Sequence, residues 1–150
     1  GRTSMKLISI KAVGFLFGIG LLAMSGCGAD AGIEISGSWQ SDYDALEEIS
    51  DTSWSTTASS VTTVYSIVKF DNETNMLITQ NAADAAYDPE KFNKLVWTEI
   101  SNDTFYYCMV DYSKASVAEA EASTETADSS DPTTSDAPQW PQLRQRVSSA

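Results

Sequence analysis

The chain has 150 residues, of which 21 are acidic, nine are basic and none is histidine, so its formal net charge at pH 7 is −12. This negative charge disfavours binding to nucleic acid and to anionic lipid surfaces. The missing histidine excludes histidine metal ligands and every catalytic triad or dyad that uses histidine as its base.

An apolar run, Ala12–Met24, follows Met5 and the basic residues Lys6 and Lys11. The run is shorter than the roughly 20 residues that span a bilayer, but its length and basic flank are typical of a secretory signal. Residues 1–4 are then a remnant upstream of the start. A buried helix or a true membrane anchor is the alternative interpretation.

The apolar run ends in Ser25-Gly26-Cys27, which resembles the processing site of bacterial lipoproteins. The resemblance implies that residues 1–26 are removed as a signal peptide and that Cys27 carries a lipid. It also implies a place in the bacterial cell envelope, with the outer membrane favoured because no aspartate directly follows Cys27. Plain secretion is the alternative. The remaining chain has six basic and 21 acidic residues, which leaves a charge of −15.

Residues 27–33 are expected to form a tether, and residues 34–122 to form one small β domain. Aromatic and β-branched residues alternate there with turn residues, which is typical of short strands. Two polar stretches, 71–75 and 101–103, predict the turns of two hairpins. The predicted strands are 36–40, 46–49, 53–57, 61–70, 76–80, 94–100 and 104–110.

Two of these strands carry additional expectations. Residues 46–49 could also form one helical turn. Apolar residues occupy both parities of 61–70, which predicts that part of this strand is covered on both faces.

A short helix is predicted over residues 116–122, because alanine and glutamate are good helix formers. Residues 123–150 are predicted to be a flexible tail, since the stretch up to Pro138 holds no apolar residue larger than alanine. The predicted fold is therefore mainly β. We expect a small antiparallel sheet or partial barrel of about six or seven strands, with one short C-terminal helix, an N-terminal signal helix and a disordered tail.

Gly37-Ser38-Trp39 resembles the Gly-x-Trp opening of lipocalin-type and avidin-like barrels. A broader resemblance, over about residues 37–134, is to a group of small uncharacterised bacterial envelope proteins, and it implies a shared fold without an activity. The shared motifs, in order, are Gly37-x-Trp39, Gln80-Asn81, Lys91-Phe92-x-Lys94-Leu95-x-Trp97-Thr98, Phe105-Tyr106-Tyr107-Cys108 and Ala127-Asp128-x-x-Asp131-Pro132.

In that group a second cysteine usually follows the Asp-Pro stretch and could pair with the cysteine of the Tyr-Tyr-Cys strand. This chain has no cysteine there, so the resemblance implies that Cys108 lacks its partner. One hypothesis is a single-nucleotide deletion that replaces the native sequence from about Asp136 onward. Resequencing the locus tests it, since an intact reading frame in independent isolates would refute it.

We expect a non-catalytic binding or interaction module whose partner is an envelope protein or a small ligand, held at the membrane by the lipid on Cys27. The proposed ligand site is a cleft between the 94–110 hairpin and the long connection 81–93. Its aromatic candidates are Tyr87, Phe92, Trp97 and Tyr106. Packing in the core is the competing role for aromatic residues, because a domain of this size is only marginally stable.

Two alternatives remain open: a structural lipoprotein without a specific ligand, and an envelope hydrolase that uses paired carboxylates. Asp71-x-Glu73-x-Asn75 has the spacing that opens a calcium loop, but the glycine and glutamate that such a loop needs are missing. We therefore expect a hairpin turn, no metal site, no cofactor and no catalytic residue. The conceivable acid pairs are Asp42/Asp44, Glu47/Glu48 and Glu99/Asp111.

Overall fold

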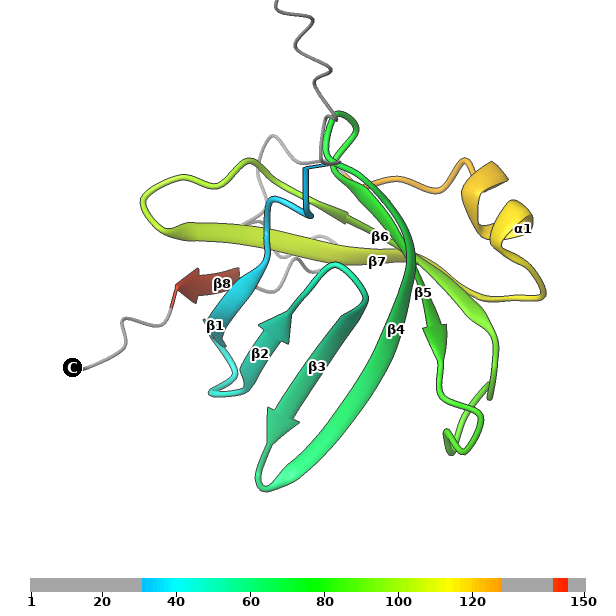
Figure 1. The fold of residues 1–150 in the computed structure, drawn as a ribbon, viewed down its shortest axis with the longest axis horizontal. Helices are drawn as coiled ribbons and strands as arrows, with labels where there is room; N and C mark the ends of the chain where they lie inside the picture. Colours follow the sequence, from blue (N-terminus) through cyan, green and yellow to red (C-terminus); the bar gives the residue numbers. More distant parts are fainter. Residues whose placement is uncertain (1–30, 128–141, 146–150) are drawn as a thin grey trace, which may run out of the picture.

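The computed structural model describes residues 31–127 and the backbone of residues 142–145. The predicted signal segment, Cys27 and the Asp-Pro stretch lie outside the described residues. The predicted fold class is confirmed, because the chain is mainly β with one short helix (Figure 1). The first seven strands are β1 (Gly37–Ser41), β2 (Leu46–Ile49), β3 (Ser53–Ala58), β4 (Val61–Asp71), β5 (Met76–Asn81), β6 (Phe92–Trp97) and β7 (Thr104–Lys114).

Each of these strands pairs antiparallel with the next, and the sheet curls around a common interior (Figure 1). Both predicted hairpins are present, with the turn after Asp71 joining β4 to β5 and the turn after Ser101 leading into β7. The alternative of a helical turn over 46–49 is wrong, because these residues form β2 between β1 and β3.

An eighth strand, β8 (Gln142–Gln145), pairs with β1 on one side and with β7 on the other, and so closes the barrel. It lies in the segment 123–150, where the sequence predicts a flexible tail, and no pattern in the sequence indicates it. Its four residues include a single apolar one, Leu143. Partner strands on both sides, and not an intrinsic strand preference, therefore account for this element.

The prediction that part of β4 is covered on both faces is wrong, because Val64 and Val68 are exposed. A bulge between the pairs Ile67↔Thr79 and Lys69↔Ile78 shifts the register of β4 against β5. Such a bulge inserts one residue and reverses the alternation of faces. Ile67 and Phe70 both reach the core for this reason, and apolar residues occur at both parities.

One end of the barrel is filled by side chains. The segment before β1 lies over this end, where Ile33 and Ile35 are fully buried. The backbone N–H of Ile33 donates to Asp51 Oδ1 at 2.8 Å, and Asn72 Nδ2 donates to the carbonyl of Gly32 at 3.0 Å. The core cluster consists of Ile33, Ile35, Trp39, Ile49, Trp54, Ile67, Leu77, Leu95, Trp97 and Phe105.

The helix α1 (Val117–Ala122) begins one residue after the predicted start, because Ser116 is its N-cap. Ser116 Oγ accepts from the backbone N–H of Glu119 at 3.1 Å, and Glu119 Oε2 accepts from the N–H of Ala115 at 3.0 Å. Reciprocal bonds of this kind satisfy N–H groups that a helix start leaves free. Within the described ranges, no helix has the length and apolar character needed to cross a membrane.

Candidate ligand-binding site

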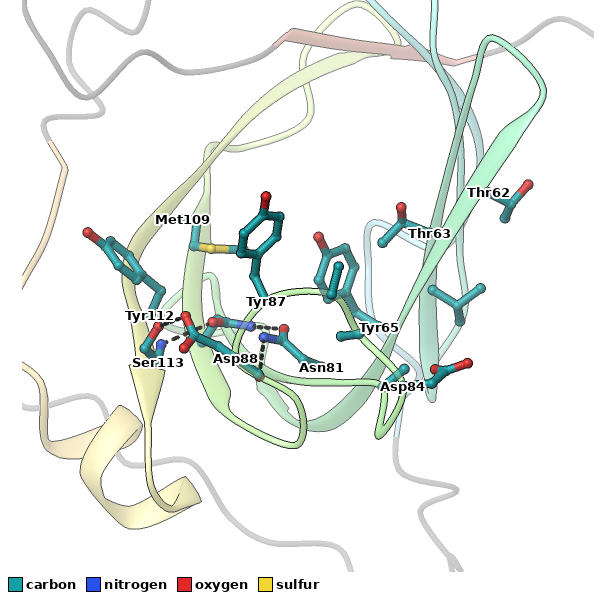
Figure 2. Close-up of a pocket in the computed structure, with 15 residues that line it drawn as sticks. Thr62, Thr63, Tyr65, Asn81, Asp84, Tyr87, Asp88, Met109, Tyr112 and Ser113 are labelled. Atoms are coloured by element: carbon teal, nitrogen blue, oxygen red, sulfur yellow. Dashed lines mark hydrogen bonds between the residues drawn. The ribbon is translucent and has the colours of Figure 1, made fainter.

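The end of the barrel opposite the segment 31–35 is hollow. A cavity of about 550 Å³ opens there, between the start of β4, the connection after β5 and the end of β7 (Figure 2). β4 links the two ends, since Thr62 lies at the cavity and Asp71 lies at the far turn beside Asn72, which binds the segment 31–35. The side chains of Tyr65, Tyr87 and Met109 gather around the hollow in Figure 2.

A second cavity of about 260 Å³ adjoins the first and lies deeper in the barrel. Thr63, Tyr65 and Met109 line both cavities, so the two form one concave site. The inner wall adds the aromatic rings of Trp54 and Tyr107, whose centroids are 4.7 Å apart. The site therefore combines aromatic faces with hydroxyl groups.

Strand alternation explains why these residues share the interior. Trp54 pairs with Tyr65, and Thr56 pairs with Thr63, so two rungs of the β3–β4 ladder point the same way. The inward position that follows along β4 is Ile67, which belongs to the core. Along β4, the inward side chains therefore bear hydroxyl groups near the open end and become apolar toward the core.

A hydrogen-bond network holds the connection between β5 and β6 against β7. Asn93 is buried, and its Nδ2 donates to Asn81 Oδ1 at 2.7 Å, while its Oδ1 accepts from the N–H of Ser113 at 3.3 Å. Asn81 Nδ2 donates to the carbonyl of Asp88 at 2.9 Å, and Ser113 Oγ donates to the Asp88 carboxylate. These bonds fix the rim that carries Tyr87.

Glu47 lies behind the inner wall and is 2% exposed. Its Oε2 accepts from Trp54 Nε1 at 2.8 Å and from Thr56 Oγ1 at 2.5 Å, and both donors line the inner cavity. Burial, together with the charge of Glu47, raises the pKa of Tyr107 well above its usual value, so this phenol stays neutral. Glu47 thus orients the wall of the site.

The four aromatic candidates from the sequence have different locations in the structure. Tyr87 lines the outer cavity and is 86% exposed, whereas Trp97 is a core residue whose Nε1 donates to Glu34 Oε1 at 2.6 Å. Phe92 and Tyr106 line neither cavity and stand next in sequence to the buried residues Asn93 and Phe105. Neighbouring residues on a strand face opposite ways, which directs both rings away from the interior.

The sequence places the ligand cleft between the 94–110 hairpin and the connection 81–93, and a cavity of the structure borders the same connection. The connection 81–93 forms one wall, but the opposite walls come from β4 and the end of β7 in place of the β6–β7 hairpin. Three lining residues, Tyr65, Met109 and Tyr112, were not among the candidates predicted from the sequence. Tyr65 was detectable from its even spacing to Ile67, whereas Tyr112 lies beyond the predicted end of the strand at residue 110.

The acid pairs considered from the sequence differ in burial, bind other partners or are exposed. Glu47 is buried while its neighbour Glu48 is exposed, as strand alternation requires. Glu99 accepts from Asn75 Nδ2, whereas Asp111 binds Ser123 and Lys114. The pair Asp42/Asp44 is exposed on the turn between β1 and β2.

The remaining motifs have structural roles. Asp71 Oδ1 accepts the backbone N–H groups of Glu73 and Thr74, which hold the pKa of Asp71 below its usual value and form the hairpin turn. Cys108 is a free, buried cysteine of β7, and burial raises the pKa of its thiol. In the ranges 31–127 and 142–145, no group of three or more acidic, cysteine or histidine side chains could hold a metal ion.

Comparison of the chain with protein-family models, with curated proteins and with solved structures finds no match. The candidate site therefore depends on its geometry and on the chemistry of its walls.

Proposed function

We propose that this protein is a lipid-anchored, non-catalytic binding module of the bacterial cell envelope, and that it holds a small ligand in the open end of its barrel. The observation that carries the proposal is the pair of adjoining cavities, which join aromatic side chains to a fixed polar rim. The proposed anchor is a lipid on Cys27, and the proposed place is the outer membrane, as the processing motif implies.

The dimensions of the site fit this role. Small-molecule sites usually enclose about 300–1,000 Å³, with mainly apolar walls and a few placed polar groups. The outer cavity, at about 550 Å³, lies inside that range. Tyr65, Tyr87 and Met109 supply contact surface, while Thr63 supplies a hydroxyl group.

The filled half of the barrel supports the proposal as well. Ten buried residues form the core cluster of the part of the chain that the structure describes, so the hollow end is not needed to bury these apolar side chains. Trp54 and Tyr107 connect the two halves, because they pack against each other and also line the inner cavity. Ligand contact can therefore be added without rearrangement of the core.

A fluorescence titration tests the binding function. The full chain carrying Cys27→Ala, so that no lipid competes, is titrated with the neutral apolar dye N-phenyl-1-naphthylamine. Energy transfer to the dye from the tryptophans of the barrel, Trp39, Trp54 and Trp97, reports binding, and the Tyr65 variant locates it. We expect the energy transfer to saturate with dye concentration. Tyr65→Ala should lower the affinity for the dye at least about tenfold, which corresponds to 1.4 kcal/mol.

The control is Tyr43→Ala, since Tyr43 is an exposed tyrosine outside both cavities. Its dye affinity should equal that of the parent protein. Equal affinities for the Tyr65 and Tyr43 variants would refute a ligand site in the barrel mouth. Loss of the protein from the membrane fraction when Cys27→Ala is expressed in a bacterial host tests the anchor separately.

A further inference from the structure

We infer that the ligand of this site is an organic cation, an amine or a quaternary ammonium ion. The inference rests on the proposed binding function and narrows it to one ligand class. Two independent features of the walls support it, namely the sign of every charge that lines the outer cavity and the number of aromatic faces that surround it.

The charged residues that line the outer cavity are both acidic. Asp84 and Asp88 belong to its lining, and no lysine or arginine of the described residues does. Lys69 pairs with Glu121, Lys114 pairs with Asp111, and Lys94 Nζ donates to the carbonyl of Ser123 at 2.7 Å, while Lys91 is exposed and lines neither cavity. The charges of the lining therefore repel an anionic ligand and attract a cation.

Aromatic faces are the second feature. Tyr65, Tyr87 and Tyr112 line the outer cavity, and Figure 2 shows the rings of Tyr65 and Tyr87 close to its centre with Tyr112 at its edge. Trp54 and Tyr107 continue this lining inward. The face of an aromatic ring is negative and attracts ammonium groups, so several rings gathered around one hollow favour a cation.

Glu47 adds a buried acidic group behind the same wall. It is bonded to Trp54 and Thr56, which line the inner cavity, and is 2% exposed. The acidic surface of the whole chain, with a net charge of −12, also raises the local concentration of small cations at the mouth.

The test compares two molecules of the same shape and different charge. Choline and its neutral isostere 3,3-dimethyl-1-butanol are titrated against the full chain carrying Cys27→Ala, and saturation-transfer NMR on their methyl signals gives the dissociation constants. We expect choline to bind at least about tenfold more tightly, because only the ammonium is attracted to the ring faces and carboxylates. Equal or tighter binding of the neutral isostere would overturn the inference.

Three variants assign the effect to the proposed walls. Tyr65→Leu and Asp84→Asn should each weaken choline binding severalfold, while Tyr43→Leu, outside both cavities, should leave it unchanged. Asp84 is exposed, so its substitution leaves the fold intact. An Asp84→Asn variant with undiminished choline affinity would contradict the role given to the acidic rim.

Salt dependence provides a further measurement. Raising ionic strength from about 0.01 M to 0.15 M shortens the screening length from about 30 Å to 8 Å. Choline binding should weaken, and binding of the neutral isostere should not change. If the neutral dye binds in the mouth but choline does not, the binding function stands and the cation inference fails; if neither binds, both fail.

Discussion

Glu47→Ala is expected to be one of the most destabilising substitutions of a charged residue in this barrel. The side chain is 2% exposed, and its Oε2 accepts hydrogen bonds from the indole of Trp54 and the hydroxyl of Thr56. Truncation leaves the Trp54 N–H, whose ring is 3% exposed, without an acceptor among the residues that surround it. The half-buried Thr56 hydroxyl can turn toward water instead.

The magnitude follows from these two donors. Removing the charged partner of a buried donor costs about 1.5–3 kcal/mol, and the more exposed hydroxyl adds about 0.5–1 kcal/mol. Relief of the desolvation of a buried carboxyl offsets part of this loss. We therefore expect Glu47→Ala to lower the free energy of unfolding by about 2–3 kcal/mol. Glu47→Gln, which keeps an acceptor oxygen, should cost about 1 kcal/mol.

Urea unfolding followed by tryptophan fluorescence and by far-UV circular dichroism measures both values. Glu48→Ala is the matched control, because Glu48 is the exposed neighbour on β2 and should change stability by less than about 0.5 kcal/mol. A double-mutant cycle of Glu47→Gln with Thr56→Val should show a coupling of at least about 0.5 kcal/mol. If Glu47→Ala and Glu48→Ala unfold at the same urea concentration, the assigned role of the buried carboxyl is refuted.

Three further predictions concern single groups. In the Cys27→Ala chain, the buried Cys108 thiol, whose pKa is raised, should react with a disulfide reagent near pH 8 at least about tenfold more slowly in the folded state than in urea; equal rates would contradict this. The pKa of Tyr107 is raised above 10.0, so the unfolded chain loses this proton at a lower pH than the folded chain. The free energy of unfolding should therefore fall as the pH rises above about 10. Denaturation at a series of increasing pH values should show a smaller fall for Tyr107→Phe than for the parent protein. The pKa of Asp71 is lowered from 3.8, so its contribution to folding stability should be present above that pH and be lost as the pH falls through the lower pKa of the folded state. In thermal melts, acidification should lower the melting temperature less for Asp71→Asn than for the parent protein.

The sequence predicts the seven consecutive strands and the short helix because their signals are local. Turn residues separate the strands, and Ser116 with Glu119 marks the start of the helix. The strand β8 has no such signal, because its stability comes from β1 and β7, which lie far away in the sequence. The cover expected for β4 was wrong for a related reason, since only pairing with β5 reveals the bulge after Ile67.

The site was less predictable than the fold. The sequence singles out aromatic residues but does not tell a core ring such as Trp97 from a wall ring such as Tyr65, because both occupy inward positions of strands. The two rings differ in their position along the barrel axis, and a sequence does not show where along that axis the packed core ends. Glu47 was considered only as a member of an acid pair, and its burial follows from the register of β2 with β1 and β3.

The segment that leads into β1 determines how the barrel would stand on a membrane. Ile33 is buried at the filled end and lies six positions after Cys27, which limits the stem to roughly 20 Å when fully extended. A lipid on Cys27 would therefore hold the filled end close to the bilayer and direct the open mouth toward the aqueous phase. This orientation suits the binding of water-soluble molecules. It does not suit the extraction of lipids from the same leaflet, because the cavity faces away from the bilayer.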